Sequence, residues 1–343
     1  MDAAEMRRKP VTEGVPMKYT VSILTLGCRV NQYESDALAA SLRARGATIV
    51  PFGDPADVAV VNTCTVTAES DRKSRQMIRR AAQTATSVVV TGCYAQTSPQ
   101  EAAETEGVVF VTGNDGKASL ADEVARILGI GAPPSLPAGR ISVGPPAGRQ
   151  GVEMTLSVPQ RTRSYIKIED GCGNRCAYCL IRTARGPVRS KDPALVLEEA
   201  RTLADAGAKE VILTGIEAAS YGLDFPDRKP YGHALAALIR EVNEVPGIRR
   251  IGLGSLEPTV MTAYFASAAR DADKLLPHLH LSVQSGSAGI LRAMRRRYVP
   301  DAVLEAGRDR GSRDGGSGPG EKQARTRGTA RSGRSTDPGG LAR

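Results

Sequence analysis

Apolar runs alternate with amphipathic segments between residues 19 and 130. The runs YTVSILTLG, DVAVVNTC, SVVVTGC and GVVFVTG are rich in β-branched residues, which is typical of buried strands. Residues 31–47 and 68–83 instead repeat apolar positions at helical spacing, as at Leu38 and Leu42. Strands that alternate with helices predict an α/β domain, with an open parallel sheet and helices on both of its faces.

A second βα series follows residues 131–160, where proline and glycine dominate and which we interpret as a linker. The pattern from 161 to 306 indicates a partial, incomplete parallel β/α barrel. Its expected strands are 165–169, 210–215, 249–254 and 278–284, and its expected helices are 193–206, 232–243 and 258–269.

Composition excludes several classes of protein. Hydrophobic residues make up 41% of the 343 residues, which excludes a wholly disordered chain. No apolar run approaches the roughly 18 residues of a membrane span. Residues 1–18, which we expect to be flexible, lack the apolar run of a secretion signal. We therefore expect a cytoplasmic protein with no membrane partner, in which cysteines are rarely paired as disulfides.

Basic residues are concentrated at the C-terminal end. The whole chain has 46 Lys and Arg against 37 Asp and Glu, a net charge of +9. Residues 307–343 hold nine of the basic residues, four of the acidic ones and a single large aliphatic residue, Leu341. Such a segment buries too little apolar area to offset its ordering entropy, so we predict a disordered basic tail. The charge fits a nucleic-acid partner, and a solvated tail without a role explains it equally well.

Three of the six cysteines, Cys28, Cys64 and Cys93, each stand at the C-terminal end of a predicted parallel strand. Ligands bind at this edge of an open α/β sheet, where residues far apart in sequence converge. Burial as a structural thiol would explain any one of them, but three equivalent positions favour a shared site. Three thiolates suit an iron–sulfur cluster with one open iron, and zinc is the alternative that would need a fourth ligand.

The other three cysteines lie in GCGNRCAYC, where Cys172, Cys176 and Cys179 follow the predicted strand 165–169. This spacing allows one loop to wrap a single cubane cluster. A zinc knuckle without its fourth ligand is the alternative. Together with Tyr178 and the β/α barrel, the motif resembles that of the radical S-adenosylmethionine (SAM) enzymes.

The radical SAM resemblance implies that the open iron binds the amino and carboxyl groups of SAM, and that the protein positions a 5′-deoxyadenosyl radical. Polar residues after the barrel strands are then candidates for contacts to SAM. Glu217 could accept a hydrogen bond from the amino group, and Gly215 would let the backbone approach the ligand closely. The candidate SAM-binding residues are Tyr178, Gly215, Glu217, Ser255, Glu257 and Gln284.

The order of the two domains and the residues around the cysteines narrow the resemblance. The segments LGCRVNQYESDAL, VVNTCTVTAESDRKSRQMIRRA, VVVTGCYAQ and GCGNRCAYCLIRTARGPVRS most resemble the tRNA threonylcarbamoyladenosine methylthiotransferases (MtaB type). The resemblance implies two 4Fe–4S clusters, an auxiliary one on the first three cysteines and a SAM-cleaving one on the last three. It implies that C2–H of N6-threonylcarbamoyladenosine, next to the anticodon, is replaced by a methylthio group.

The same resemblance implies the partners. They are the anticodon stem-loop of tRNA, an electron donor protein and a sulfur source. Arg182, Arg185 and Arg189 follow the cysteine loop and could hold RNA phosphates or the threonylcarbamoyl carboxylate, because arginine forms bidentate pairs with both. Ordinary surface or structural arginines are the alternative.

The sequence departs from the family after VPDAVLEAG, where the family continues with more barrel strands and a small β-rich TRAM domain. The abrupt change of composition near Gly307 motivates the hypothesis of a truncated or frame-disrupted product. Two other functions therefore stay open. One is an inactive remnant, and the other is methylthiolation of a different adenosine derivative or of a protein side chain.

Overall fold

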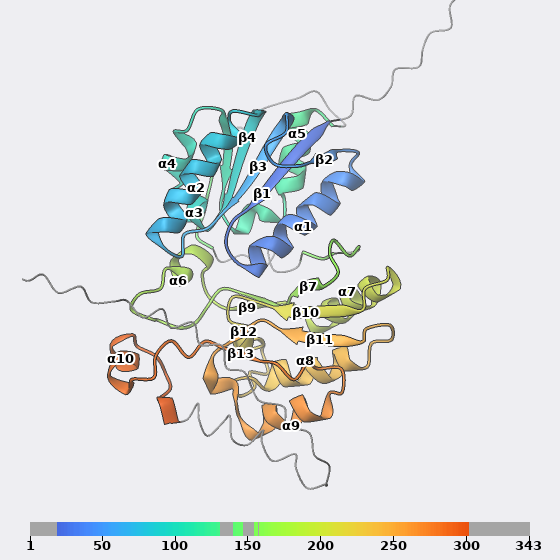
Figure 1. The fold of residues 1–343 in the computed structure, drawn as a ribbon, viewed down its shortest axis with the longest axis vertical. Helices are drawn as coiled ribbons and strands as arrows, with labels where there is room; N and C mark the ends of the chain where they lie inside the picture. Colours follow the sequence, from blue (N-terminus) through green and yellow to red (C-terminus); the bar gives the residue numbers. More distant parts are fainter. Residues whose placement is uncertain (1–18, 131–139, 147–153, 157, 302–343) are drawn as a thin grey trace, which may run out of the picture.

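The computed structural model of the protein describes residues 19–130, 140–146, 154–156 and 158–301. Figure 1 shows an α/β molecule with two domains stacked along its long axis, the first carrying β1 to α5 and the second β7 to α10. The predicted flexible N-terminus and the predicted disordered tail lie outside the described residues.

The first domain is built on a six-stranded sheet with the order β2-β1-β3-β4-β5-β6, in which all neighbours are parallel. Its strands are β1 (Thr20–Thr25), β2 (Thr48–Val50), β3 (Ala56–Thr63), β4 (Ala85–Gly92), β5 (Val108–Thr112) and β6 (Ile141–Ser142). Its helices are α1 (Arg29–Ala44), α2 (Ala68–Ala81), α3 (Cys93–Thr97), α4 (Pro99–Ala103), the 3₁₀ turn η1 (Asp115–Lys117) and α5 (Leu120–Leu128). The predicted open parallel sheet is confirmed, and its last strand comes from within the segment interpreted as a linker.

Helices cover both faces of this sheet. Val58, Val60 and Val89 belong to an apolar core with α1 and α5, whereas Val61 and Val90 belong to a second core with α2 and α3. Successive residues of a strand point to opposite faces. The central strands are therefore apolar throughout because both of their faces are covered.

The second domain has a short parallel sheet with the order β11-β10-β7, surrounded by helices. Its strands are β7 (Ser164–Lys167), β8 (Glu169–Asp170), β9 (Arg189–Ser190), β10 (Glu210–Thr214), β11 (Arg250–Leu253), β12 (Ser255–Leu256) and β13 (His280–Leu281). Its helical elements are α6 (Ile181–Arg185), α7 (Pro193–Asp205), η2 (Ala218–Ser220), α8 (His233–Asn243), η3 (Pro258–Val260), α9 (Ala263–Asp271) and α10 (Ala288–Ala293). In the described ranges, no helix has both the length and the apolar character needed to cross a membrane.

Two predicted elements of the second domain differ from the structure. The expected strand 278–284 is reduced to β13, which pairs only with β12. The left-handed backbone of Gln284, with a φ of 64°, ends the extended run. The expected helix 258–269 is divided into η3 and α9, and α9 begins where the side chain of Thr262 accepts a hydrogen bond from the backbone N–H of Phe265.

Helix α1 docks the first domain onto the second. Its residue Tyr33 is fully buried in the apolar core of the second domain. The Tyr33 hydroxyl donates to Glu199 of α7 over 2.9 Å, and the ammonium group of Lys191 lies 3.1 Å from that hydroxyl. The two domains therefore share one core at this contact.

Candidate functional site

The three cysteines of the first domain lie at one edge of its sheet. Cys28 follows β1 and begins α1, Cys64 follows β3, and Cys93 follows β4 and begins α3. Because β1, β3 and β4 are neighbours in the sheet, the structure brings the three residues to the same edge. Cys64 and Cys93 are buried and Cys28 is exposed, so the site opens on the side of Cys28.

A glycine with a positive φ immediately precedes three of the six cysteines. Gly27, Gly92 and Gly171 have φ angles of 96°, 98° and 83°. A Cβ atom on Gly92 would lie 2.4 Å from the carbonyl oxygen of Thr63, and one on Gly27 would lie 2.9 Å from the sulfur of Cys64. Only glycine allows the strand ends to approach this closely in this conformation.

Replacing Gly92 by alanine is expected to destabilise the first domain. The alanine must adopt a positive φ, which costs about 1–2 kcal/mol, and must also push the Thr63 backbone away. Gly46→Ala is the matched control, because Gly46 has a φ of 90° but no atom within 4 Å of an added Cβ. Thermal unfolding should show a larger loss of Tm for Gly92→Ala. Equal losses would show that the contact with Thr63 contributes nothing.

The second set of cysteines lies in the loop between β8 and α6, and each sulfur accepts one N–H group. The donors are the backbone N–H of Asn174 to Cys172 (3.4 Å), the backbone N–H of Ile181 to Cys179 (3.4 Å) and the guanidinium group of Arg296 to Cys176 (3.2 Å). Hydrogen bonds to sulfur are among the features that set the potential of an iron–sulfur cluster. Burial raises the pKa of the Cys172 thiol to about 12, whereas a cysteine that binds a metal centre does so as the thiolate.

Glu217 and Glu257 face each other beside this loop. The Tyr231 hydroxyl lies 3.3 Å from an oxygen of each carboxylate, and the backbone N–H of Glu257 donates to Glu217 over 3.1 Å. The side-chain amide of Asn174 donates to Glu257 over 3.2 Å. The other oxygen of Glu257 is buried without a hydrogen bond and lies 3.7 Å from Arg296. It is an acceptor that an amino group of a ligand could satisfy.

Gly215 lies against a buried carboxylate, that of Glu169. A Cβ atom at this position would lie 2.5 Å from the Glu169 carboxylate. That carboxylate is fully buried and accepts a hydrogen bond from the backbone N–H of Glu217 over 2.9 Å. Sequence reasoning missed this role of Glu169, because the residue ends the predicted strand 165–169.

The hydrogen bonds of the described residues do not join the remaining candidates for SAM contacts to this carboxylate pair. The Ser255 hydroxyl is 2.8 Å from Nδ1 of His280. Gln284 is exposed, and the exposed fraction of Tyr178 is 51%. Of the predicted set, Glu217 and Glu257 are the two that the described structure joins through hydrogen bonds.

Glu217 is expected to make stability depend on pH. Burial raises the pKa of Glu217 to about 7, so the folded chain favours its neutral form. That stabilisation is complete below the unfolded pKa and is lost as the pH rises toward 7. Glu217→Gln keeps an acceptor oxygen but cannot ionise, so between pH 4 and 8 it should gain about 2–3 kcal/mol relative to wild type in urea unfolding. The variant Glu198→Gln at an exposed position of α7 should show no such gain. A pH-independent difference for Glu217→Gln would contradict the assignment.

The two cysteine sets border one interface between the domains. Helix α3, which begins at Cys93, contacts α6, which follows Cys179. The side-chain amide of Asn114 donates to the carbonyl oxygen of Ala184 over 2.7 Å and lies 3.8 Å from the sulfur of Cys93. The segments that follow the last cysteine of each set therefore pack against each other.

A buried ionic network connects the domains behind this contact. Arg185 of α6 pairs with Glu34 of α1 over 2.7 Å and with Asp170 of β8 over 3.1 Å. Lys117 lies 2.5 Å and Lys167 2.7 Å from the Glu34 carboxylate. Burial alone would raise the pKa of Glu34, but the charges of Arg185, Lys117 and Lys167 hold it well below its usual range. The network therefore fixes α6 against α1.

For two of the three arginines after the cysteine loop, the structure agrees with the alternative of a structural role and not with contact to RNA phosphates or the threonylcarbamoyl carboxylate. Arg185 and Arg189 are buried, and Arg189 pairs with Asp115 of the first domain over 2.5 Å. A buried guanidinium needs carboxylate partners, and these come from segments that the sequence does not place nearby. Arg182 is exposed, and within the described part of the chain its one hydrogen-bond acceptor is the backbone oxygen of Gly173.

Each of the two cysteine sites supplies three thiols, the number that would leave one iron of a 4Fe–4S cluster open. Among the residues that the structure describes, no three His, Cys, Asp or Glu side chains are grouped to hold one metal ion.

Comparisons with families of known proteins divide the chain in the same way. Residues 20–113 match the uncharacterized protein family UPF0004, and residues 166–311 match the radical SAM superfamily. A similar solved structure is a radical SAM methyltransferase, TsrM, from Kitasatospora setae, with a TM-score of 0.56 and 17% identity over 86% of this chain and 66% of that one. At this level of sequence identity, the similarity shows that the two proteins share a fold.

Curated relatives are more similar in sequence. The chain is 40% identical over 286 residues to the threonylcarbamoyladenosine tRNA methylthiotransferase MtaB of Bacillus subtilis, covering 82% of this chain and 61% of the relative. It is 37% identical over 289 residues to MtaB of Aquifex aeolicus, covering 83% and 68%. A tRNA-2-methylthio-N(6)-dimethylallyladenosine synthase of Oleidesulfovibrio alaskensis is 34% identical, with 81% and 60% covered. The chain thus spans about three fifths of the length of the Bacillus subtilis relative.

Proposed function

Because the chain belongs to the MtaB family of threonylcarbamoyladenosine tRNA methylthiotransferases, we propose that it adds a methylthio group at C2 of N6-threonylcarbamoyladenosine in tRNA. The cofactors of the family are SAM and two 4Fe–4S clusters. In this reaction one SAM would supply the methyl group, and the sulfur source would supply the sulfur. An electron from the donor protein would cleave a second SAM, which would leave as methionine and, with the C2 hydrogen, 5′-deoxyadenosine.

The observation that supports this proposal most strongly is the pair of three-cysteine sites on one interface. Cys28, Cys64 and Cys93 would hold the auxiliary cluster, and the loop cysteines would hold the SAM-cleaving cluster. The packing of α3 against α6 brings the two sites to neighbouring segments. A substrate base held between the two cysteine sites would be within reach of both the 5′-deoxyadenosyl radical and the sulfur.

The chain's own residues bind and orient the reactants. When bound, the loop cluster and SAM supply the radical that removes hydrogen. The unsatisfied oxygen of Glu257 is suited to accept from the SAM amino group, and Tyr231 holds Glu257 against Glu217. Arg296 donates a hydrogen bond to the sulfur of Cys176 and so positions that side of the loop.

The partners follow from the proposed reaction. They are the anticodon stem-loop of tRNA, the electron donor protein and the sulfur source, and the site of action is the cytoplasm, where tRNA is modified. The MtaB name of the relatives supports the tRNA substrate.

The test is anaerobic reaction of the reconstituted chain with SAM, sulfide, reductant and an RNA stem-loop that carries N6-threonylcarbamoyladenosine. Mass spectrometry of the digested nucleosides should show its 2-methylthio derivative. If the product forms only on a stem-loop that carries another N6-modified adenosine, that nucleoside is the substrate instead. Release of 5′-deoxyadenosine without any nucleoside product would favour a protein substrate, and no turnover at all would favour an inactive remnant.

A further inference from the structure

We propose that the exposed face of α2 binds the phosphate backbone of the RNA substrate. This inference rests on the proposed function, because it assigns the tRNA a place on the first domain. Helix α2 carries Arg72, Lys73, Arg75, Arg79 and Arg80 against two acidic residues in its first turn. All of these cations except Arg75 are exposed, and Arg75 is half-buried.

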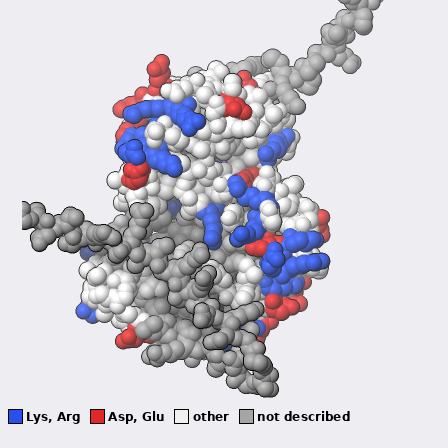
Figure 2. Space-filling view, in the orientation of Figure 1, with Lys and Arg blue, Asp and Glu red and all other residues white. Residues whose placement is uncertain are grey.

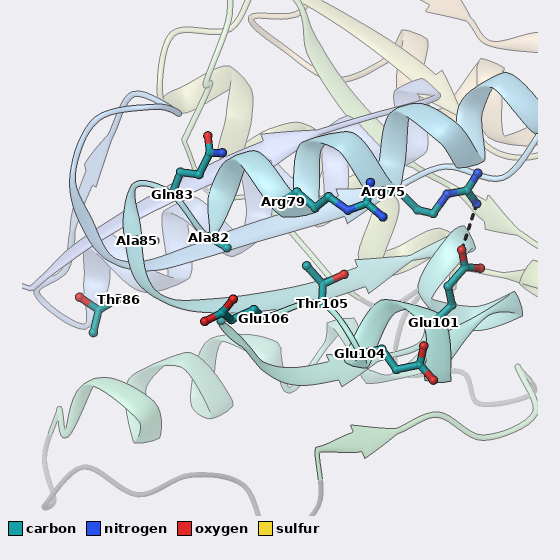
Figure 3. Close-up of a pocket in the computed structure, with 11 residues that line it drawn as sticks. Arg75, Arg79, Ala82, Gln83, Ala85, Thr86, Glu101, Glu104, Thr105 and Glu106 are labelled. Carbon is teal, nitrogen blue, oxygen red and sulfur yellow. Dashed lines mark ion pairs between the residues drawn. The ribbon is translucent and has the colours of Figure 1, made fainter.

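Several of these cations lack a compensating charge. Arg72 pairs with Glu69 of the same helix, and Arg75 pairs with Glu101 of α4 over 3.3 Å (Figure 3). For Lys73, Arg79 and Arg80, no carboxylate within the described ranges forms an ion pair. Like charges four residues apart on a helix repel each other, so Arg75 and Arg79 favour an anionic partner above them.

The cations line a hollow along the helix. A surface groove of about 530 Å³ is bordered only by residues of α2 and the turn after it, which include Arg72, Gln76, Arg79 and Gln83. These side chains recur once per turn, about every 5–6 Å along the axis. Arginine and glutamine side chains are common donors to phosphate oxygens. The groove thus presents a row of donors that a nucleic-acid strand can follow.

A second cavity limits where the strand can lie. It holds about 830 Å³ between α2 and the α4–β5 turn, and Figure 3 shows Arg75 and Arg79 on one wall with Glu104 and Glu106 on the other. Acidic side chains repel phosphate, so the RNA would follow the α2 wall and not cross to α4. Figure 2 shows Lys and Arg side chains gathered over α2 with acidic residues at their margin.

The surface fits nucleic acid better than a protein partner. Protein interfaces have an apolar core, but no large apolar side chain of α2 is exposed. The N-terminus of α2 also lies close in sequence to the first cysteine site, since the helix begins four residues after Cys64. The Ser74 hydroxyl on its inner face donates to the Cys64 carbonyl oxygen over 2.9 Å. RNA held along α2 would therefore lead to the first cysteine site.

The test is the triple variant Lys73→Glu/Arg79→Glu/Arg80→Glu in the full chain. The control is Arg201→Glu/Lys209→Glu/Arg249→Glu, which makes the same change of charge at three exposed cations. These control positions lie in the second domain, on α7 or directly before β10 and β11, and none belongs to α2 or its groove. Fluorescence anisotropy of a labelled RNA stem-loop, repeated across salt concentrations, measures affinity and its salt dependence.

The α2 variant should bind at least about tenfold more weakly, and the slope of log affinity against log salt should fall by about 2, as expected for three lost phosphate contacts. The control should bind nearly as wild type does. Equal losses in both variants, no loss in either, or no binding of RNA by wild type would each overturn the proposal. Iron content and 5′-deoxyadenosine release should be unchanged in the α2 variant. If wild type itself releases no 5′-deoxyadenosine, the proposed function fails and not the assignment of the RNA surface.

Discussion

Replacing Arg185 by leucine is expected to lower the free energy of unfolding by about 3–5 kcal/mol. The substitution removes the guanidinium group from the buried carboxylates of Glu34 and Asp170, although Lys117 remains beside Glu34 and Lys167 remains beside both. Removing one member of a buried ion pair costs more than the pair itself contributes, because a charge stays desolvated. Urea unfolding followed by circular dichroism measures the loss.

Arg182→Leu provides the control within the same short helix. Arg182 is exposed and has only a backbone oxygen as partner, so its replacement should change stability by about 0.5 kcal/mol or less. If Arg185→Leu does not fold, Arg185→Lys should fold with an intermediate stability, because lysine restores the charge without the two-pronged geometry. Equal stability of Arg185→Leu and Arg182→Leu would show that the buried network does not hold the domains together.

The second large effect concerns the separate roles of the two cysteine sets, one in SAM cleavage and the other in sulfur transfer. Cys176→Ala should lose about four of the irons bound after reconstitution and all release of 5′-deoxyadenosine. Cys93→Ala should also lose about four irons but should still release 5′-deoxyadenosine, while forming no methylthio product. Iron analysis and chromatography of the SAM products distinguish the two variants.

A conservative variant checks that these losses come from the ligands. Cys93→Ser preserves the size of a buried residue and should behave as Cys93→Ala does. Loss of 5′-deoxyadenosine release in both Cys93 variants would contradict separate roles for the two sets. If either Cys93 variant still forms the methylthio product, Cys93 is not required for the transfer of sulfur.

The sequence predicts the first domain well because its strands are continuous apolar runs with helices on both sides. Gly27 and Gly92, which precede cysteines at strand ends with a positive φ, are recognised only in the structure. The cysteine sites follow from the same pattern, because parallel strands bring their C-terminal ends to one edge. In these regions local pattern and tertiary packing agree.

Long-range contacts could not be predicted in this way. Arg185 looks like a surface residue in the sequence, and its burial depends on Glu34, which lies 151 positions earlier. Arg296 reaches Cys176 across 120 positions, and no motif marks it. Glu169 ends a strand and gives no sign that its carboxylate fills the space beside Gly215. The role of each of these side chains depends on a partner that is distant in the sequence and adjacent only in the folded protein.

The central claim is that this chain assembles a working radical SAM site. The most direct test is anaerobic reconstitution with iron and sulfide, followed by counting the 5′-deoxyadenosine released from SAM under reductant. The account predicts release by wild type that disappears in Cys176→Ala. Two clusters bound without any release of 5′-deoxyadenosine would contradict it.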